Sequence, residues 1–145
     1  MFFNKKLIST KDEERLIASI KAAELNTSGE IRIHITKYCK GDALEACKKQ
    51  FEQLNMHQTK DRNAILFYLA IKSKTFSVWG DEGIHLKVHD EFWKEITQCA
   101  IDYFKKGDIV LGLETSVKMC GEKLKLYFPY HSNDKNELSD NVSFS

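Results

Sequence analysis

The chain has almost no net charge and no long apolar run. Its 145 residues include 22 basic and 21 acidic side chains, so the formal net charge is +1. That balance gives no electrostatic footprint for nucleic acid or for a membrane surface. No run of about 18 apolar residues exists, and residues 1–7 lack an apolar stretch of signal-peptide length. The sequence therefore predicts a cytoplasmic protein without a membrane anchor.

The sequence also lacks the short motifs of common cofactor and catalytic sites. It has no Gly-x-x-x-x-Gly-Lys-Ser/Thr phosphate loop, no Gly-x-Gly-x-x-Gly turn and no Gly-x-Ser-x-Gly nucleophile elbow. Its four cysteines never form a Cys-x-x-Cys pair, which argues against a zinc ribbon or a redox motif. We expect mostly buried free thiols at Cys39, Cys47, Cys99 and Cys120.

The most informative stretch runs from residue 61 to residue 84. Eight consecutive apolar residues, 64–71, follow a charged turn, which is typical of a strand covered on both faces. Three residues separate this run from a second β-prone run, 75–79, and that spacing predicts a hairpin. In an antiparallel pair the start of the first strand lies beside the end of the second. Asp61 would then meet Asp81 and Glu82 at one edge of the sheet.

Helical and strand periodicities predict further elements around this hairpin. Helices are expected to begin near Thr10, Asp42, Asp90 and Asp108, and residues 30–36 alternate as a strand. A strand, a helix and a strand in one compact domain imply a parallel pair joined by a right-handed crossover. The predicted fold class is therefore α/β: a three-layer-like sandwich whose small mixed sheet, a parallel pair plus an antiparallel hairpin strand, is flanked by about four helices.

Chain length and composition predict one domain over residues 1–130. Residues 131–145 are polar and rich in Ser, Asn and Asp, so we expect a disordered tail there. His34 lies on the polar face of the strand at 30–36. A ligand or proton carrier is one interpretation of His34, but we expect a partly exposed residue without a chemical role.

Four acidic side chains are the candidate functional residues. Glu30 begins the first predicted strand, Asp61 precedes the second, and Asp81 and Glu82 follow the third, so the predicted pairings bring all four to one end of the sheet. Clustered carboxylates repel one another unless a cation joins them. Oxygen ligands in loops suit Ca²⁺ or Mg²⁺, and such an ion can polarise a phosphoryl oxygen and orient a water. The competing interpretation is a solvated acidic turn without a ligand.

Three segments resemble a known family, the TPM domain, also called the TPM phosphatase domain. They are Ser-Gly-Glu-Ile-Arg at 28–32, Arg-Asn-Ala-Ile-Leu at 62–66 and Gly-Asp-Glu-Gly-Ile at 80–84. Phe-Lys-Lys-Gly-Asp at 104–108 is similar to the C-terminal pattern of that family. The resemblance covers roughly residues 7–128. It implies an α/β sandwich with a small mixed sheet between helices.

The resemblance does not imply a single activity. A plant thylakoid member is described as an acid phosphatase, and relatives have been linked to divalent cations. Other members serve photosystem II repair or act as receptor auxiliary subunits. Many relatives carry a signal peptide and a membrane anchor, and neither is expected here.

Two main functional hypotheses follow, beside a third in which the chain is a small cytosolic enzyme that uses His34 or a cysteine. In the first, the chain is a TPM-type domain that binds Ca²⁺ or Mg²⁺ and has metal-assisted hydrolysis of a phosphomonoester as its potential activity. Asp61 and Asp81 would be ligands, Glu30 and Glu82 additional or outer ligands, and Arg62 would steady a phosphate. In the second, the domain is a non-catalytic protein-interaction module. No nucleophile–base pair is recognisable, and the second hypothesis expects exposed apolar anchors such as Trp79 or Tyr130. Substrate, protein partner and oligomeric state stay open.

Overall fold

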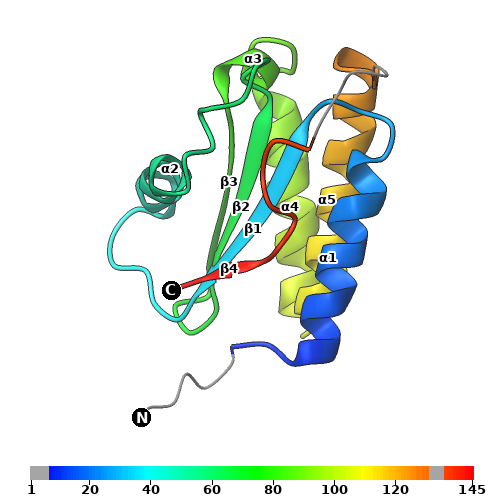
Figure 1. Ribbon diagram of the computed structural model, residues 1–145. Coiled ribbons are helices and arrows are strands. Elements are labelled where there is room, and N and C mark those ends of the chain that lie inside the picture. The colour runs from blue at the N-terminus through cyan, green and yellow to red at the C-terminus, as the bar shows by residue number, and fades with distance from the viewer. Residues whose placement is uncertain (1–6, 131–135) are drawn as a thin grey trace.

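The computed structural model describes residues 7–130 and 136–145 and shows an α/β sandwich built on a four-stranded sheet (Figure 1). The strand order is β3-β2-β1-β4. β1 and β2 are parallel, and β2 and β3 form the predicted antiparallel hairpin. The predicted mixed sheet is confirmed and has one additional strand. The strands are β1 (Glu30–Thr36), β2 (Ala64–Ala70), β3 (Thr75–Gly80) and β4 (Ser143–Phe144).

Helices cover both faces of the sheet. α2 lies on one face, and α1, α4 and α5 lie on the other (Figure 1). The N-cap of α1 is Ser9, one residue before the predicted position, and its side chain accepts a hydrogen bond from the Asp12 amide. Asp42 caps α2 as predicted. The helices are α1 (Thr10–Glu24), α2 (Ala43–Gln53), the single turn α3 (Glu82–His85), α4 (Asp90–Lys105) and α5 (Ile109–Tyr127).

The alternating side chains of β2 join two separate parts of the core. All of its residues are buried, as the unbroken apolar run predicts. Ile65 and Phe67 belong to the larger cluster with α1, α4 and α5, whereas Leu66 and Tyr68 belong to the smaller cluster with α2. All four cysteines are free thiols, two of them buried and two half-buried. Nowhere in residues 7–130 or 136–145 is a helix both long and apolar enough to cross a bilayer.

The structure differs from the expected disordered tail over residues 136–145, which we call the strap. Ser143 and Phe144 form β4 and pair in parallel with His34 and Ile35 of β1. Val142 is only 6% exposed and lies in the larger core cluster. Composition misses this because two apolar side chains, Val142 and half-buried Leu138, are enough to dock an otherwise polar segment. The remainder of the expected tail, residues 131–135, lies outside the described residues.

His34 also differs from its prediction. Its side chain is 1% exposed rather than partly exposed, because the strap covers it on the outer side of β1. The alternating pattern of β1 placed His34 on the polar face correctly. It could not reveal that this face is covered by a distant part of the chain.

Replacing Val142 by Ala should lower the free energy of unfolding by about 1–2 kcal/mol, because the lost methyl groups leave a cavity in a packed cluster. Denaturant unfolding monitored by circular dichroism measures the change. Asn141→Ala, at the exposed neighbouring position, is the matched control and should have little effect. Equal and negligible effects of the two substitutions would show that the strap is not docked in solution.

Candidate functional site

The predicted site residues come from three segments at one end of the sheet. The parallel register places Glu30 beside Ala64, so the start of β1 lies next to the loop that carries Asp61. The hairpin register pairs Ile65 with Gly80, so the end of β3 lies on the other side of the same loop. The three segments therefore meet as predicted, but their carboxylates take different partners.

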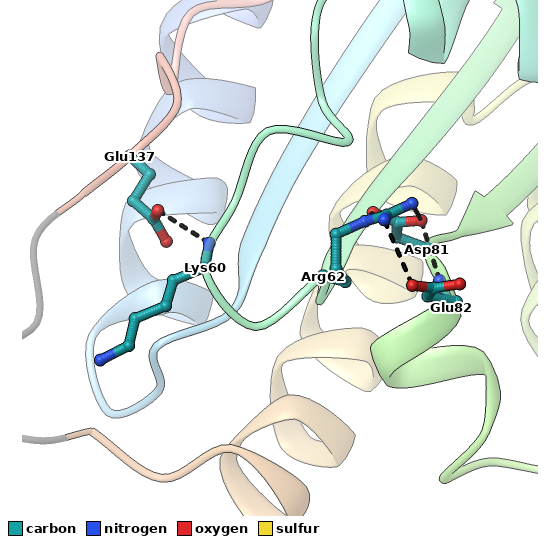
Figure 2. A network of polar contacts seen from close by, with 5 residues as sticks. All are labelled: Lys60, Arg62, Asp81, Glu82 and Glu137. Carbon is teal, nitrogen blue, oxygen red and sulfur yellow. Dashed lines mark hydrogen bonds and ion pairs between the residues drawn. The ribbon is translucent and has the colours of Figure 1, made fainter.

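Arg62 holds the two acidic residues that follow β3. Its Nε and Nη2 donate to the two carboxylate oxygens of Asp81 at 2.6 and 2.9 Å, and its Nη1 lies 3.2 Å from Glu82 Oε1 (Figure 2). Asp81, only 5% exposed, also accepts a hydrogen bond from the Glu82 amide and so caps α3. The hydrogen bond and charge of Asp81 raise the pKa of Arg62. Asp81 is thus an ion-pair partner here, and the Arg62 guanidinium expected to steady a phosphate is already neutralised.

A tight backbone contact keeps Arg62 in this position. Arg62 has φ of 50°, in the left-handed region that most residues avoid. Its carbonyl accepts a 2.7 Å hydrogen bond from the Gly83 amide. A Cβ atom on Gly83 would lie 2.1 Å from the Asp61 carbonyl oxygen, so only glycine permits the approach. The close contact at Gly83 therefore holds loop 59–63 against the start of α3.

Asp61 belongs to a second, separate set of polar contacts. Its Oδ2 accepts a 3.4 Å hydrogen bond from Ser28 Oγ, and Ser28 Oγ accepts one of 3.3 Å from Asn63 Nδ2. Asn63 is completely buried, yet its Oδ1 has no hydrogen-bond partner. Thr59 Oγ1, in the same loop, is likewise buried without a partner. Buried oxygen atoms without donors are costly and rare, so this loop contains unused capacity for a ligand.

Glu30 faces a different neighbourhood, beneath the strap. Its Oε1 accepts a 2.8 Å hydrogen bond from the Leu138 amide, and burial raises its pKa to about 7. Glu24 lies nearby and accepts a 2.7 Å hydrogen bond from the Ile31 amide. Burial, followed by the hydrogen bond with Asp140, raises the pKa of Glu24 to about 10. These three carboxyl groups line one cavity of about 590 Å³, and at neutral pH Glu24 keeps its proton.

The four carboxylates proposed from the sequence thus form no common ligand set. Asp81 and Glu82 bind Arg62, Asp61 contacts Ser28, and Glu30 supports the strap. Among the residues that the structure describes, no group of three or more His, Cys, Asp and Glu side chains could hold a metal ion. Ser28 and Asn63 were missed by the sequence reasoning. The available signal was an amide residue directly before the buried run of β2.

The two aromatic anchors expected for an interaction module differ in exposure. Trp79 is half-buried, with Lys48 Nζ 4.6 Å from its ring centroid and His85 stacked at 6.1 Å. Tyr130 is 52% exposed. Of the two, only Tyr130 has the free surface that the interaction hypothesis requires.

Comparison with known proteins identifies the family. A family model described as the TPM domain matches residues 2–123. The chain belongs to the TPM domain family. No protein with a curated description matches it. The resemblance of the three sequence segments is therefore confirmed at the level of the family.

Several solved structures have a similar fold. The NMR structure of the BA42 protein from the psychrophilic bacterium Bizionia argentinensis is 34% identical, has a TM-score of 0.91, and the match covers 100% of both chains. The N-terminal domain of a P. gingivalis protein is 18% identical with a TM-score of 0.69, covering 88% of this chain and 83% of that chain. The N-terminal domain of cg2496 from Corynebacterium glutamicum is 17% identical with a TM-score of 0.58, covering 81% and 74%. The last two show the shared fold alone.

Replacing Glu24 by Gln should flatten the pH dependence of stability of this TPM domain. In the folded chain Glu24 keeps its proton up to about pH 10, whereas the unfolded chain releases it near the ordinary pKa of 4.5. Because the folded state binds the extra proton between these values, the free energy of unfolding of the wild type falls as pH rises, by at most about 1.4 kcal/mol per pH unit. Gln has no such proton, yet it can still donate to Asp140 and accept from Ile31.

Denaturant unfolding at about pH 6 and about pH 9 measures this effect. The difference between the two pH values should be smaller for Glu24→Gln than for the wild type. Glu122→Gln, at an exposed position of α5, is the control and should follow the wild type. A pH profile unchanged by Glu24→Gln would mean that Glu24 is ionised in the folded protein at neutral pH.

Proposed function

We propose that this TPM domain binds a divalent cation, Ca²⁺ or Mg²⁺, at loop 59–63 beside the start of β1. The observation that carries the proposal is the side-chain oxygen of Asn63, buried without a donor in a chain of contacts that ends at the Asp61 carboxylate. Oxygen atoms without donors are what a hard cation requires as ligands. Asp61 and Asn63 are the proposed ligands, and Ser28 contributes its hydroxyl oxygen.

The chemistry of these donors indicates a weak site. Ca²⁺ accepts carboxylate, amide carbonyl and backbone carbonyl oxygens together, and its affinity rises with the number of charged ligands. Only one of the proposed ligands, Asp61, is charged. We therefore expect dissociation constants in the range of about 10⁻⁴–10⁻³ M, typical of sites with few carboxylates.

Asp81 and Glu82 are not among the proposed ligands, because both pair with Arg62. Either carboxylate would first have to give up its ion pair with Arg62 before it could bind a cation. For Asp81 this would leave a buried carboxylate without its present partner. Glu30 is engaged with the strap. The revised ligand set therefore keeps Asp61 from the sequence prediction and adds Asn63 and Ser28.

The second part of the proposal is hydrolysis of a phosphomonoester, which depends on the bound cation. A bound cation would polarise a phosphoryl oxygen and lower the pKa of a water that it orients. Arg62 would assist a phosphate only by exchanging Asp81 and Glu82 for it. No nucleophile–base pair is assigned, so cation binding is the function that the geometry favours and hydrolysis depends on it.

Titration of Ca²⁺ and of Mg²⁺ into isotopically labelled protein tests the binding site. Amide and side-chain shifts should change locally at Ser28, Asp61 and Asn63 at about millimolar metal. Asp61→Asn should weaken binding about tenfold or more, since it removes the only charged ligand. Asp102→Asn, an exposed acidic position on α4, is the matched control and should bind as the wild type does.

Two results would contradict the assignment. Unchanged shifts at millimolar metal would exclude a cation site at this loop. Changes centred on Glu24 and Glu30, unaffected by Asp61→Asn, would place the cation beneath the strap. For hydrolysis, a general phosphomonoester substrate should be cleaved only with added cation, and Asp61→Asn should abolish this. Cleavage that is independent of both would not come from this site.

A further inference from the structure

The backbone N–H and C=O groups on the outer edge of β1 have an unusual mixture of hydrogen-bond partners. The Ile31 amide donates to the side chain of Glu24 at 2.7 Å rather than to a neighbouring strand. The Ile33 carbonyl accepts a 3.4 Å hydrogen bond from Ser143 Oγ, and the Ile35 carbonyl accepts one of 3.2 Å from the Ser145 amide. Side chains therefore occupy some of the hydrogen-bonding positions on this edge that a full strand would fill with backbone groups.

The strap fills only part of this edge. β1 pairs with β2 through all of its residues from Glu30 to Thr36, but it pairs with β4 only at His34 and Ile35 (Figure 1). A longer extended segment could continue the ladder toward Ile31, which the strap does not do. The edge thus offers more backbone hydrogen bonding than its present occupant uses.

His34 gives the edge a side-chain preference. Its Nδ1 lies 2.7 Å from Ser143 Oγ and its Nε2 lies 2.8 Å from Ser145 Oγ, while its ring stacks on Tyr68 at 5.8 Å. Burial lowers the pKa of His34 to about 4, so the ring is neutral at pH 7, with one nitrogen as donor and one as acceptor. Hydroxyl groups can serve both nitrogens. Without them, a buried imidazole would lose both partners.

Val142 supplies the buried apolar anchor beside β4, and half-buried Leu138 packs against the smaller core cluster. Val142 is 6% exposed and packs in the cluster that contains Ile31, Ile33 and Ile35, whereas Phe144 is 40% exposed. Strand alternation places Val142 on one face of the sheet and Ser143 and Ser145 on the other. The occupant is therefore recognised by one buried β-branched side chain followed by hydroxyl residues at alternate positions.

We propose that the outer edge of β1 is a binding site for an extended peptide, and that the strap is its displaceable occupant within the chain. The partner is a segment with a β-branched residue, then a hydroxyl residue, any residue, and a second hydroxyl residue. It adds a strand to the sheet, with backbone hydrogen bonds providing affinity and His34 reading the hydroxyl groups. This site is separate from the proposed cation site and does not depend on it.

Because the strap belongs to the same chain, it competes with any free peptide for the edge of β1. An intramolecular segment competes at an effective concentration of about millimolar, so a free peptide of the same sequence binds the wild type poorly. A partner gains an advantage when it also pairs with Ile31, where it replaces the Glu24 side chain, or when the strap is weakened. This arrangement restricts access to an exposed strand edge that would otherwise invite non-specific pairing.

Fluorescence anisotropy with a dye-labelled peptide of residues 136–145 tests the proposal on the full chain. Val142→Asp places a charge in the apolar cluster and should release the strap, so this variant should bind the peptide at least about tenfold more tightly than the wild type. Asn141→Asp adds the same charge at the exposed neighbouring position and should bind as weakly as the wild type. A peptide with Ser143→Ala and Ser145→Ala should bind Val142→Asp at least about tenfold more weakly, because His34 loses its partners.

Amide exchange of Ile65 and Phe67 reports whether Val142→Asp is folded. If it is folded and does not bind the peptide, or binds the doubly substituted peptide equally well, the proposal is wrong. Persistent protection of the Ser145 amide in Val142→Asp would also overturn it, because the strap would not be displaceable. Should Val142→Asp unfold, Val142→Ser replaces it, and failure of that variant to bind more tightly than the wild type likewise overturns the proposal.

Discussion

Burial of β2 on both faces is the constraint on which the rest of this structure depends. Each residue of this strand is buried, so its two sets of side chains need separate coverings. α2 covers Leu66 and Tyr68, while α1, α4 and α5 cover Ile65 and Phe67. A strand buried in this way must also have neighbours on both edges, because unpaired backbone groups in a core are costly. β1 and β3 provide them, and their directions bring three loops to one end of the sheet.

At that end of the sheet, ion pairing with Arg62 decides which carboxylates are available to a ligand. Arg62 neutralises Asp81 and Glu82, and the close approach of Gly83 fixes Arg62 in place. Only the Asp81 side of this ion pair is buried, so removing Arg62 would leave the Asp81 carboxylate buried without its partner. Asp61 escapes this pairing and keeps a contact with Ser28 and, through it, with buried Asn63. The arrangement separates a structural ion pair from a loop with unused oxygen atoms.

The parts of the fold that follow from local pattern could be predicted from the sequence. The run at 64–71 and the short turn after it specified the hairpin, and the alternation of 30–36 specified β1. The ion pair of Arg62 could not be predicted, because it depends on a left-handed backbone position and a loop contact that residue types do not encode. The strap was missed for a related reason. Its docking rests on Val142 and Leu138 and on hydroxyl groups that bond His34, more than a hundred residues earlier in the chain. Composition averages over such individual contacts.

The strap also connects loop 59–63 with the outer edge of β1. The Lys60 amide, next to Asp61, donates a 3.0 Å hydrogen bond to Glu137 Oε2 (Figure 2). The Leu138 amide donates to Glu30 at the start of β1. Loop 59–63 and the edge of β1 are therefore both in contact with the same segment, the strap. Ligands at two sites influence each other only when a shared element has different contacts in the two states. The strap meets that condition, because its release removes the Glu137 contact from the loop and the hydroxyl contacts from His34 together.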